Sequence, residues 1–336
     1  MDQTDKFTLE LIKRLSVAIG VTGYSGPQAI QPAIAAEMSP YVDRVDRDRL
    51  GSVIGFKPGQ QTAEDKARRK IMLAAHLDEI GAVVTQIDRG FLRFTQIGGL
   101  DDRLLMGQEV LVHAQRDLPG LIGSIPPHLL PPGEAHYTVD QANMHIDVGL
   151  PPDQVVKLVR VGDLVSFART PAELLNGLLS GKAMDNRASV AAMIVCLQQL
   201  QQLRHGWDVY AVATANEEWG QYVGATTQAY AIRPDVAIAI DVTFADVEEI
   251  EVKLDAGPVI GLGPSNHPAM RQRLISLCEE LELKYQIEVM PAGAGTDAYA
   301  IEISREGVPT VLISVPSRYM HSPVEVIQPR DVERIG

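Results

Sequence analysis

Residues 236–242 read VAIAIDV, an apolar run in which Asp241 is the first polar side chain. A strand with this pattern is apolar on both faces, which is typical of a central strand in an α/β sheet with covered faces. Asp241 ends the apolar run, at the edge where such a sheet presents side chains to a crevice. A carboxylate buried there needs a partner, because an unpaired buried charge is costly. A metal ion is one such partner, and a helix N-terminus or an arginine is the simpler alternative.

The chain alternates between strand-like and helix-like patterns on both sides of this run. Apolar residues at helical spacing predict helices, and short apolar runs predict buried strands. His76 lies near the end of one such strand, and Glu217 and Glu218 close another. This alternation predicts an α/β domain. The strands are predicted in KIMLAAHLDEIGAVV (70–84), WDVYAVATANEE (207–218), YQIEVM (285–290) and VPTVLISV (308–315), and the helices in RASVAAMIVCLQQLQQL (187–203), HPAMRQRLISLCEELEL (267–283) and TDAYAIEIS (296–304).

The sequence pattern of residues 80–167 differs from that of the rest of the chain. Four short alternating runs, FLRFTQIG, QEVLVHAQ, LPGLIGSI and DLVSFART, are separated by Gly, Pro and Asp, without a long helical pattern. We therefore predict that residues 80–167 form a β-rich domain inserted into an α/β catalytic domain, which is made of residues 1–79 and 168–336.

The bulk composition excludes several classes of partner. The 336 residues carry a net charge of −13 and contain no basic run, so nucleic acid and anionic membrane surfaces are poor partners. Both cysteines lie in helix-like apolar patterns and are expected to be reduced core residues. The first residues, MDQTDKFTLE, lack the pattern of a secretory signal, and no apolar run reaches bilayer-spanning length. We expect a cytoplasmic protein.

Five short segments carry residue types that bind divalent metals in hydrolases. Two imidazoles and three or four carboxylates, brought together, would make a mixed nitrogen and oxygen site for two ions, which could hold a water and polarise a carbonyl. If the segments converge, the chain is a metallohydrolase. Taken alone, each residue has a simpler interpretation, such as a core histidine, a helix N-cap, a solvated strand end or a loop histidine. The candidates are His76, Asp185, Glu217, Glu218, Asp241 and His321.

In two pairs of neighbouring residues, the two members are predicted to have different roles. Asp78 follows His76 by two residues, and such residues share a face of a strand, so Asp78 could accept the second ring N–H of His76. Glu217 and Glu218 are adjacent at a strand end and would point to opposite faces. One could then bind metal while the other acts on the water as general base.

Six motifs follow one another along the chain: AHLDEIG (75–81), MDNRAS (184–189), NEEWG (216–220), AIDVT (239–243), GAGTDA (293–298) and RYMHSPVE (318–325). In this order, they resemble the motifs of the dinuclear metallo-aminopeptidases of the tetrahedral (TET) type, which include glutamyl and deblocking aminopeptidases. Some close relatives of these enzymes carry an endoglucanase label. The resemblance covers nearly the whole chain, and the ordered set is far more specific than any one motif.

The resemblance implies a role for each candidate residue. It implies Glu217 as the general base and Asp78 as the residue that orients the histidine near it. The donors include no thiolate, which suits Zn²⁺ or Co²⁺, with Mn²⁺ as a further option. The implied metal ligands are Asp185 as the bridge, His76 and Asp241 for one ion, and Glu218 and His321 for the other.

The resemblance also implies a fold and an assembly. The fold is a mixed-sheet, phosphorylase/hydrolase-like α/β domain with helices on both faces, carrying an inserted β-rich, PDZ-like domain. Members of the family commonly assemble as dodecamers with active sites that face an internal cavity. We therefore expect a large homo-oligomer, in which the insertion serves assembly and substrate access.

The function predicted in this way is removal of N-terminal residues from peptides by a hydroxide held between two metal ions. A glycosidase is an alternative that needs two carboxylates across a sugar and has no use for two histidines. A catalytically silent assembly protein is another, which the complete ligand set argues against. Trp219 and Tyr222, beside the two glutamates, suggest an apolar wall and hence neutral, aliphatic N-terminal residues, whereas Arg318 is a candidate for recognising an acidic one.

Overall fold

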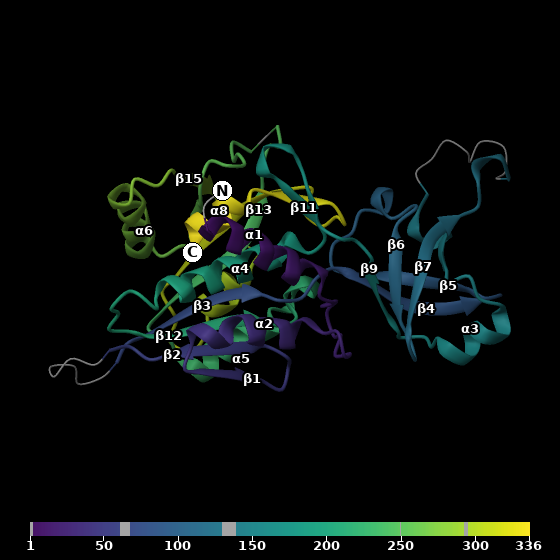
Figure 1. Cartoon of the computed structure of the whole chain (residues 1–336), viewed down its shortest axis with the longest axis horizontal. Coiled ribbons are helices and arrows are strands. Elements are labelled where there is room, and N and C mark those ends of the chain that lie inside the picture. The colour runs from purple at the N-terminus through teal and green to yellow at the C-terminus, as the bar shows by residue number, and fades with distance from the viewer. Residues whose placement is uncertain (1–2, 61–67, 130–138, 249, 292–294) are drawn as a thin grey trace.

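The computed structural model of the chain describes residues 3–60, 68–129, 139–248, 250–291 and 295–336. An α/β body and a smaller body built of strands lie side by side in it (Figure 1). None of the described helices is long and apolar enough to cross a membrane.

A mixed sheet forms the centre of the larger body. The order along its main path is β1-β2-β12-β3-β13-β16-β17-β11-β10, and β14 and β15 join it beside β16. The central strands β12, β3, β13 and β16 are parallel, whereas the flanking strands of the path pair antiparallel. The bounds are β1 Arg44–Arg47, β2 Val53–Lys57, β3 Lys70–His76, β10 Ala172–Glu173, β11 Leu179–Gly181, β12 Asp208–Thr214, β13 Val236–Phe244, β14 Val259–Leu262, β15 Gln286–Val289, β16 Thr310–Arg318 and β17 Glu325–Ile327.

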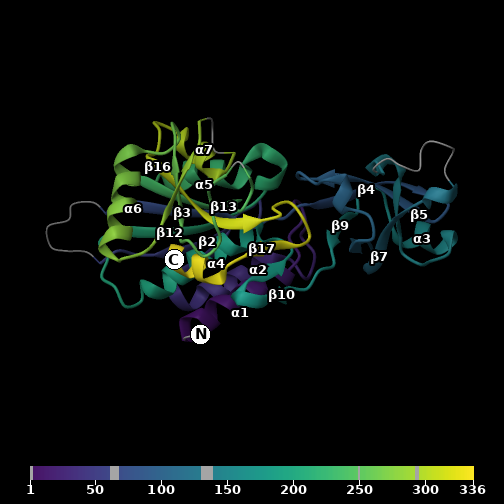
Figure 2. The same cartoon turned by 90° about the horizontal axis from the view of Figure 1, so that it is seen from above.

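Helices cover both faces of this sheet, as the family resemblance implied (Figure 2). The alternation in β3 shows why: Leu73 and Ala75 pack into the core beneath α1, α2, α4 and α8, whereas Met72 and Ala74 pack beneath α5 and α7. A strand covered on both faces is apolar throughout, which explains its unbroken apolar run. The bounds are α1 Gln3–Val17, α2 Ile30–Met38, α4 Met184–Gln199, α5 Val223–Ile232, α6 Pro268–Glu280, α7 Asp297–Glu302 and α8 Pro329–Ile335.

The smaller body is a closed six-stranded barrel that carries the α-helix α3. Its strands close in the order β4-β5-β8-β7-β6-β9, around a core of its own that includes Leu92, Val112 and Ile146. The bounds are β4 Gly81–Asp88, β5 Phe91–Ile97, β6 Glu109–His113, β7 Asp117–Ser124, β8 Met144–Asp147, β9 Leu164–Phe167 and α3 Pro152–Leu158.

The linker from β3 to the barrel is short and firmly held. It spans only residues 77–80, and within it Glu79 is 1% exposed. One carboxylate oxygen of Glu79 accepts a hydrogen bond from the Lys182 ammonium at 2.6 Å, and the other lies 3.8 Å from the Arg187 guanidinium. We call Glu79, Lys182 and Arg187 the linker ion cluster. It anchors the entrance of the barrel to the start of α4.

Candidate metal centre

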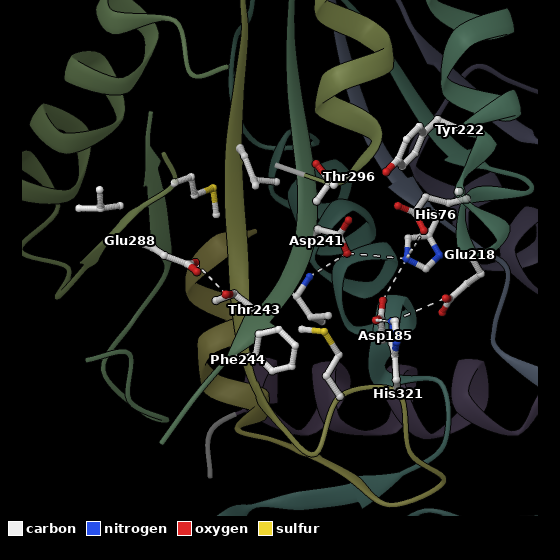
Figure 3. A pocket seen from close by; sticks show the side chains of 18 of the residues that line it. His76, Asp185, Glu218, Tyr222, Asp241, Thr243, Phe244, Glu288, Thr296 and His321 are labelled. Atoms are coloured by element: carbon white, nitrogen blue, oxygen red, sulfur yellow. Dashed lines mark hydrogen bonds and ion pairs between the residues drawn. The ribbon is translucent and has the colours of Figure 1, made fainter. Parts of the chain in front are cut away.

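The candidate residues meet at the edge of the sheet where the parallel central strands end (Figure 3). His76 is the last residue of β3, and Asp241 lies near the end of β13. Asp185 lies at the start of α4, before the backbone becomes helical, and His321 follows β16. The carboxyl ends of parallel strands form a crevice in open α/β sheets, which explains why segments so far apart in the sequence converge here.

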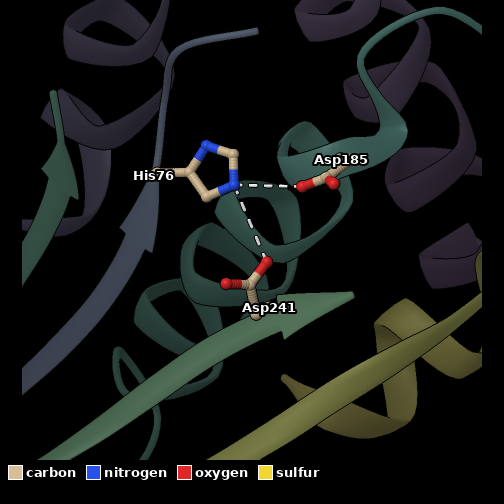
Figure 4. A group of neighbouring side chains, drawn as sticks. All are labelled: His76, Asp185 and Asp241. Atoms are coloured by element: carbon tan, nitrogen blue, oxygen red, sulfur yellow. Dashed lines mark hydrogen bonds and ion pairs between the residues drawn. The ribbon is translucent and has the colours of Figure 1, made fainter. Parts of the chain in front are cut away.

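Three of the residues form a buried triad (Figure 4). Nε2 of His76 lies 3.0 Å from Oδ1 of Asp185 and 3.7 Å from Oδ1 of Asp241. One potential ligand atom from each of the three residues lies within 4.8 Å of the others. The three side chains are therefore close enough to share one ion.

A second triad uses the other oxygen of the same aspartate. Oδ2 of Asp185 lies 3.4 Å from Nε2 of His321, and that nitrogen lies 3.7 Å from Oε2 of Glu218. These atoms also lie within 4.8 Å of one another. Asp185 thus directs one carboxylate oxygen to each histidine, which is the arrangement of a carboxylate between two cation sites.

The chemistry of the donors fits divalent cations. All five side chains offer nitrogen or oxygen, and the nearby described residues include no thiol. Oε1 of Glu218 is buried and accepts no hydrogen bond within the described part of the chain. A buried oxygen without a donor is costly, and a cation is the partner that satisfies it.

The protonation behaviour of the cluster reflects the same crowding of charge. Burial, together with the neighbouring carboxylates, raises the pKa of Glu217 to about 9 and that of Asp241 to about 8. Burial also opposes ionisation of Asp185, but hydrogen bonds from His321 and His76 lower its pKa below the ordinary range. The site therefore disfavours additional negative charge and favours positive charge.

The structure corrects the predicted setting of the two glutamates. They do not close strand β12, which ends at Thr214, but lie in a helical turn, η6, over Glu217–Gln221. The argument from opposite strand faces was therefore wrong. Both side chains still line the site: Oε2 of Glu217 lies 3.8 Å from Nε2 of His76, and Glu218 belongs to the second triad.

The Asp78 carboxylate stabilises the η6 turn in addition to lying near the His76 ring. Its Oδ1 accepts the backbone N–H of Glu217 at 3.0 Å, and its Oδ2 accepts that of Glu218 at 3.2 Å. The hydroxyl of Thr22 donates to Oδ2 at 2.6 Å. Nδ1 of His76 lies 3.2 Å from the backbone carbonyl of Asp78 and 3.7 Å from its carboxylate, because β3 has already ended at the histidine.

Two further residues support the ligands and were not predicted. Glu325 is buried and accepts the backbone N–H of Asp185 at 3.0 Å and that of His321 at 2.9 Å. Its signal was present, since it is the last residue of the motif RYMHSPVE. Gly99, in the loop after β5 of the barrel, hydrogen-bonds through its backbone to the His321 side chain. A Cβ on Gly99 would lie 2.8 Å from Nδ1 of that ring.

The site opens into a cavity of about 520 Å³. Among the described residues that line it, none is a lysine or an arginine. Tyr222 lines the cavity, but Trp219 does not and is 57% exposed. Arg318 is also outside the lining, and its Nε donates to Asp246 at 2.7 Å. The predicted aromatic wall is therefore only half present, and the predicted arginine is engaged elsewhere.

Proteins of similar sequence and structure include named aminopeptidases. The family model described as M42 glutamyl aminopeptidase matches residues 51–336. The lysyl aminopeptidase of Pyrococcus furiosus is 34% identical over 333 residues, which cover 96% of this chain and 93% of that protein.

Two solved structures extend the comparison to the whole fold. The aminopeptidase APDkam598 from the archaeon Desulfurococcus kamchatkensis has a TM-score of 0.88 and 37% identity, covering 98% of this chain and 92% of that one. The TET1 peptidase of Pyrococcus horikoshii, described as able to assemble into a tetrahedron or a large octahedral shell, has a TM-score of 0.84 and 30% identity, covering 98% and 96%. With a family match over most of its length and aminopeptidase relatives at this identity, the chain belongs to the M42 glutamyl aminopeptidase family.

Proposed function

We propose that the chain is a dinuclear metal-dependent aminopeptidase, with Asp185 as the bridge between two ions. The observation that carries the proposal is the pair of triads that share this residue, with its Oδ1 3.0 Å from Nε2 of His76 and its Oδ2 3.4 Å from Nε2 of His321. Asp241 completes the first triad and Glu218 the second. Nitrogen and oxygen donors without sulfur suit Zn²⁺ or Co²⁺, with Mn²⁺ as a further option.

In the proposed reaction, the chain supplies a base and an ordered frame. Divalent ions bound to the triads would polarise the scissile carbonyl and acidify the attacking water. Glu217 would take the proton of that water and hand it to the leaving amine. Asp78 fixes the turn that carries Glu217 by accepting its backbone N–H. His321 would be oriented by Gly99, and the N-terminal amine of the peptide would dock among the carboxylates.

We further propose that residues 80–167 act as a domain for assembly and substrate access in a large homo-oligomer of twelve subunits. The support is the assembly described for the similar TET1 peptidase and the position of the barrel loop at Gly99, directly against the site. Sedimentation of the protein at micromolar concentration tests the assembly, and a monomer alone would contradict it.

Chelation and two matched glutamate variants test the catalytic proposal. Exhaustive chelation should abolish hydrolysis of aminoacyl anilides, and Zn²⁺, Co²⁺ or Mn²⁺ should restore it. Glu217→Gln should lower kcat by roughly 10²–10⁴ while two ions remain bound, because a general base is lost. Glu218→Gln should instead reduce metal content by one ion per chain. Elemental analysis of both variants separates the two roles.

Three results would contradict this assignment. The first is full activity in a preparation verified as metal-free. The second is loss of metal in Glu217→Gln with both ions retained in Glu218→Gln, which would exchange the two roles. The third is hydrolysis of carboxymethyl-cellulose in place of anilides, which would favour the glycosidase alternative.

A further inference from the structure

The cavity contains one carboxylate that the proposed chemistry does not use. Among the described residues, five acidic side chains line the cavity. Four of them are accounted for as metal ligands or as the base: Asp185, Glu217, Glu218 and Asp241. The fifth, Glu288, comes from β15 and belongs to neither triad. Its negative charge needs another explanation.

Glu288 lies across the cavity from the two histidines and points inward (Figure 3). Its Oε2 accepts a hydrogen bond from the hydroxyl of Thr243 at 2.7 Å. Thr243 is 5% exposed, so its hydroxyl is a fixed donor that orients the carboxylate. Within the described part of the chain, no lysine, arginine or histidine forms an ion pair with Glu288.

The distance from Glu288 to the metal site suits a long side chain. Thr243 follows Asp241 by two residues in β13, so both side chains lie on the same face of the strand, about 6.6 Å apart along it. The carboxylate that Thr243 holds is therefore roughly one extended side chain from the first triad. A lysine, with its four-carbon stem and terminal ammonium, spans such a gap.

Apolar side chains in the same cavity suit the stem of such a side chain. Phe244, Val289, Met290 and Leu312 also line the cavity. Lysine and arginine pack their methylene groups on apolar surface while the charged end reaches a polar partner. An acidic side chain would meet the charge of Glu288 without a compensating cation, since the described lining contains no lysine or arginine. An aliphatic one would cover that charge without pairing it.

We infer that Glu288, oriented by Thr243, binds the cationic side chain of the peptide's N-terminal residue and makes the enzyme selective for N-terminal lysine and arginine. The inference rests on the proposed aminopeptidase function and names its substrate class. It reverses the aliphatic preference predicted from Trp219 and Tyr222, because Trp219 is outside the cavity.

A panel of anilides with the metal-loaded wild-type protein is the first test. Lysyl and arginyl anilides should exceed leucyl and glutamyl anilides in kcat/KM by roughly 10–100-fold, the value of one charge-assisted hydrogen bond. Glu288→Gln should remove most of this advantage and leave the leucyl anilide within about threefold, since the metal and base residues are untouched. Glu288→Lys should move the preference towards the glutamyl anilide. Glu279→Gln makes the same change of charge on exposed α6, away from the cavity, and should leave the ranking unchanged.

The outcomes separate this inference from the function on which it rests. Hydrolysis of no anilide at all would overturn both. Hydrolysis with leucyl equal to or above lysyl would overturn the inference alone, and this result needs only the wild-type protein. A lysine advantage that survives Glu288→Gln would also overturn it. So would an advantage seen only when lysine is the second residue of a peptide, because the cation would then lie beyond the scissile bond.

Discussion

Replacing Asp78 with asparagine should loosen the turn that carries both glutamates. The substitution keeps the size of the side chain but removes its charge and one of its two acceptor oxygens. At present Oδ1 accepts from the Glu217 N–H, and Oδ2 accepts from both the Glu218 N–H and the Thr22 hydroxyl. In either orientation of the amide, its NH₂ group faces at least one backbone N–H, which then has no acceptor.

The contacts set the expected magnitude. Losing one buried hydrogen bond to a charged acceptor costs roughly 1.5–3 kcal/mol. The bonds that remain weaken about twofold when the acceptor becomes neutral. The free energy of unfolding should therefore fall by about 3–6 kcal/mol in total. The backbone of Glu217 and Glu218 should also shift, so kcat should fall.

Guanidinium denaturation in the presence of a chelator measures this loss without a contribution from bound metal. Thr22→Val is the matched control, because it removes one of the three hydrogen bonds and leaves both backbone N–H groups paired with Asp78. It should cost only the one bond, about 1.5–3 kcal/mol, and retain activity. A free energy of unfolding for Asp78→Asn within 1 kcal/mol of the wild type would refute the assigned role.

Three further predictions concern the surroundings of the metal centre. Gly99→Ala should weaken metal binding roughly 10–100-fold in competition titrations with a chelator, because the new Cβ would lie 2.8 Å from Nδ1 of His321. Gly206→Ala is the control and should have no effect, because a Cβ at Gly206 would meet no described atom within 4 Å beyond its chain neighbours. Glu79→Gln should lower the free energy of unfolding by about 3–5 kcal/mol, since it leaves the two cations of the linker ion cluster without their counter-charge, and a loss below 1 kcal/mol would contradict this. Burial raises the pKa of Asp297 from its ordinary 3.8 to about 6. The unfolded chain therefore releases this proton at lower pH than the folded chain, and the contribution of Asp297 to stability should fall as pH rises between those values. Asp297→Asn should flatten that part of a curve of unfolding free energy against pH, and an unchanged slope would contradict the reasoning.

The convergence of the candidate residues at one edge of the sheet could be predicted, because each strand end is indicated by a local sequence pattern. The apolar run before Asp241 predicts a covered strand, and a strand's end fixes which edge of the sheet its last side chain reaches. The setting of Glu217 and Glu218 was missed, although a signal was present. Asn216, directly before them, has φ 62°, a conformation that asparagine adopts more readily than most residues and that ends a strand.

Other features depend on contacts between distant segments, which no local pattern encodes. Alternating runs predict the strands of the barrel, but its closure depends on β4 pairing with β9 across most of the insertion. Glu288 reads as an ordinary polar residue in a short strand until Thr243 is seen beside it. Gly99 has no side chain that could mark it as a site residue in the sequence. Its role depends on the His321 imidazole that packs against its backbone.

The contact between Gly99 and His321 links the barrel to the proposed metal centre. A displacement of the barrel loop changes the orientation of a proposed ligand, and hence the affinity for one ion. By reciprocity, that ion favours the loop position in which the imidazole is correctly directed, and by the same coupling free energy. In the proposed homo-oligomer, a neighbouring subunit that pressed on the barrel would therefore adjust the affinity for the proposed metal ion without touching a ligand. Binding of that ion would in turn bias how the subunits fit together.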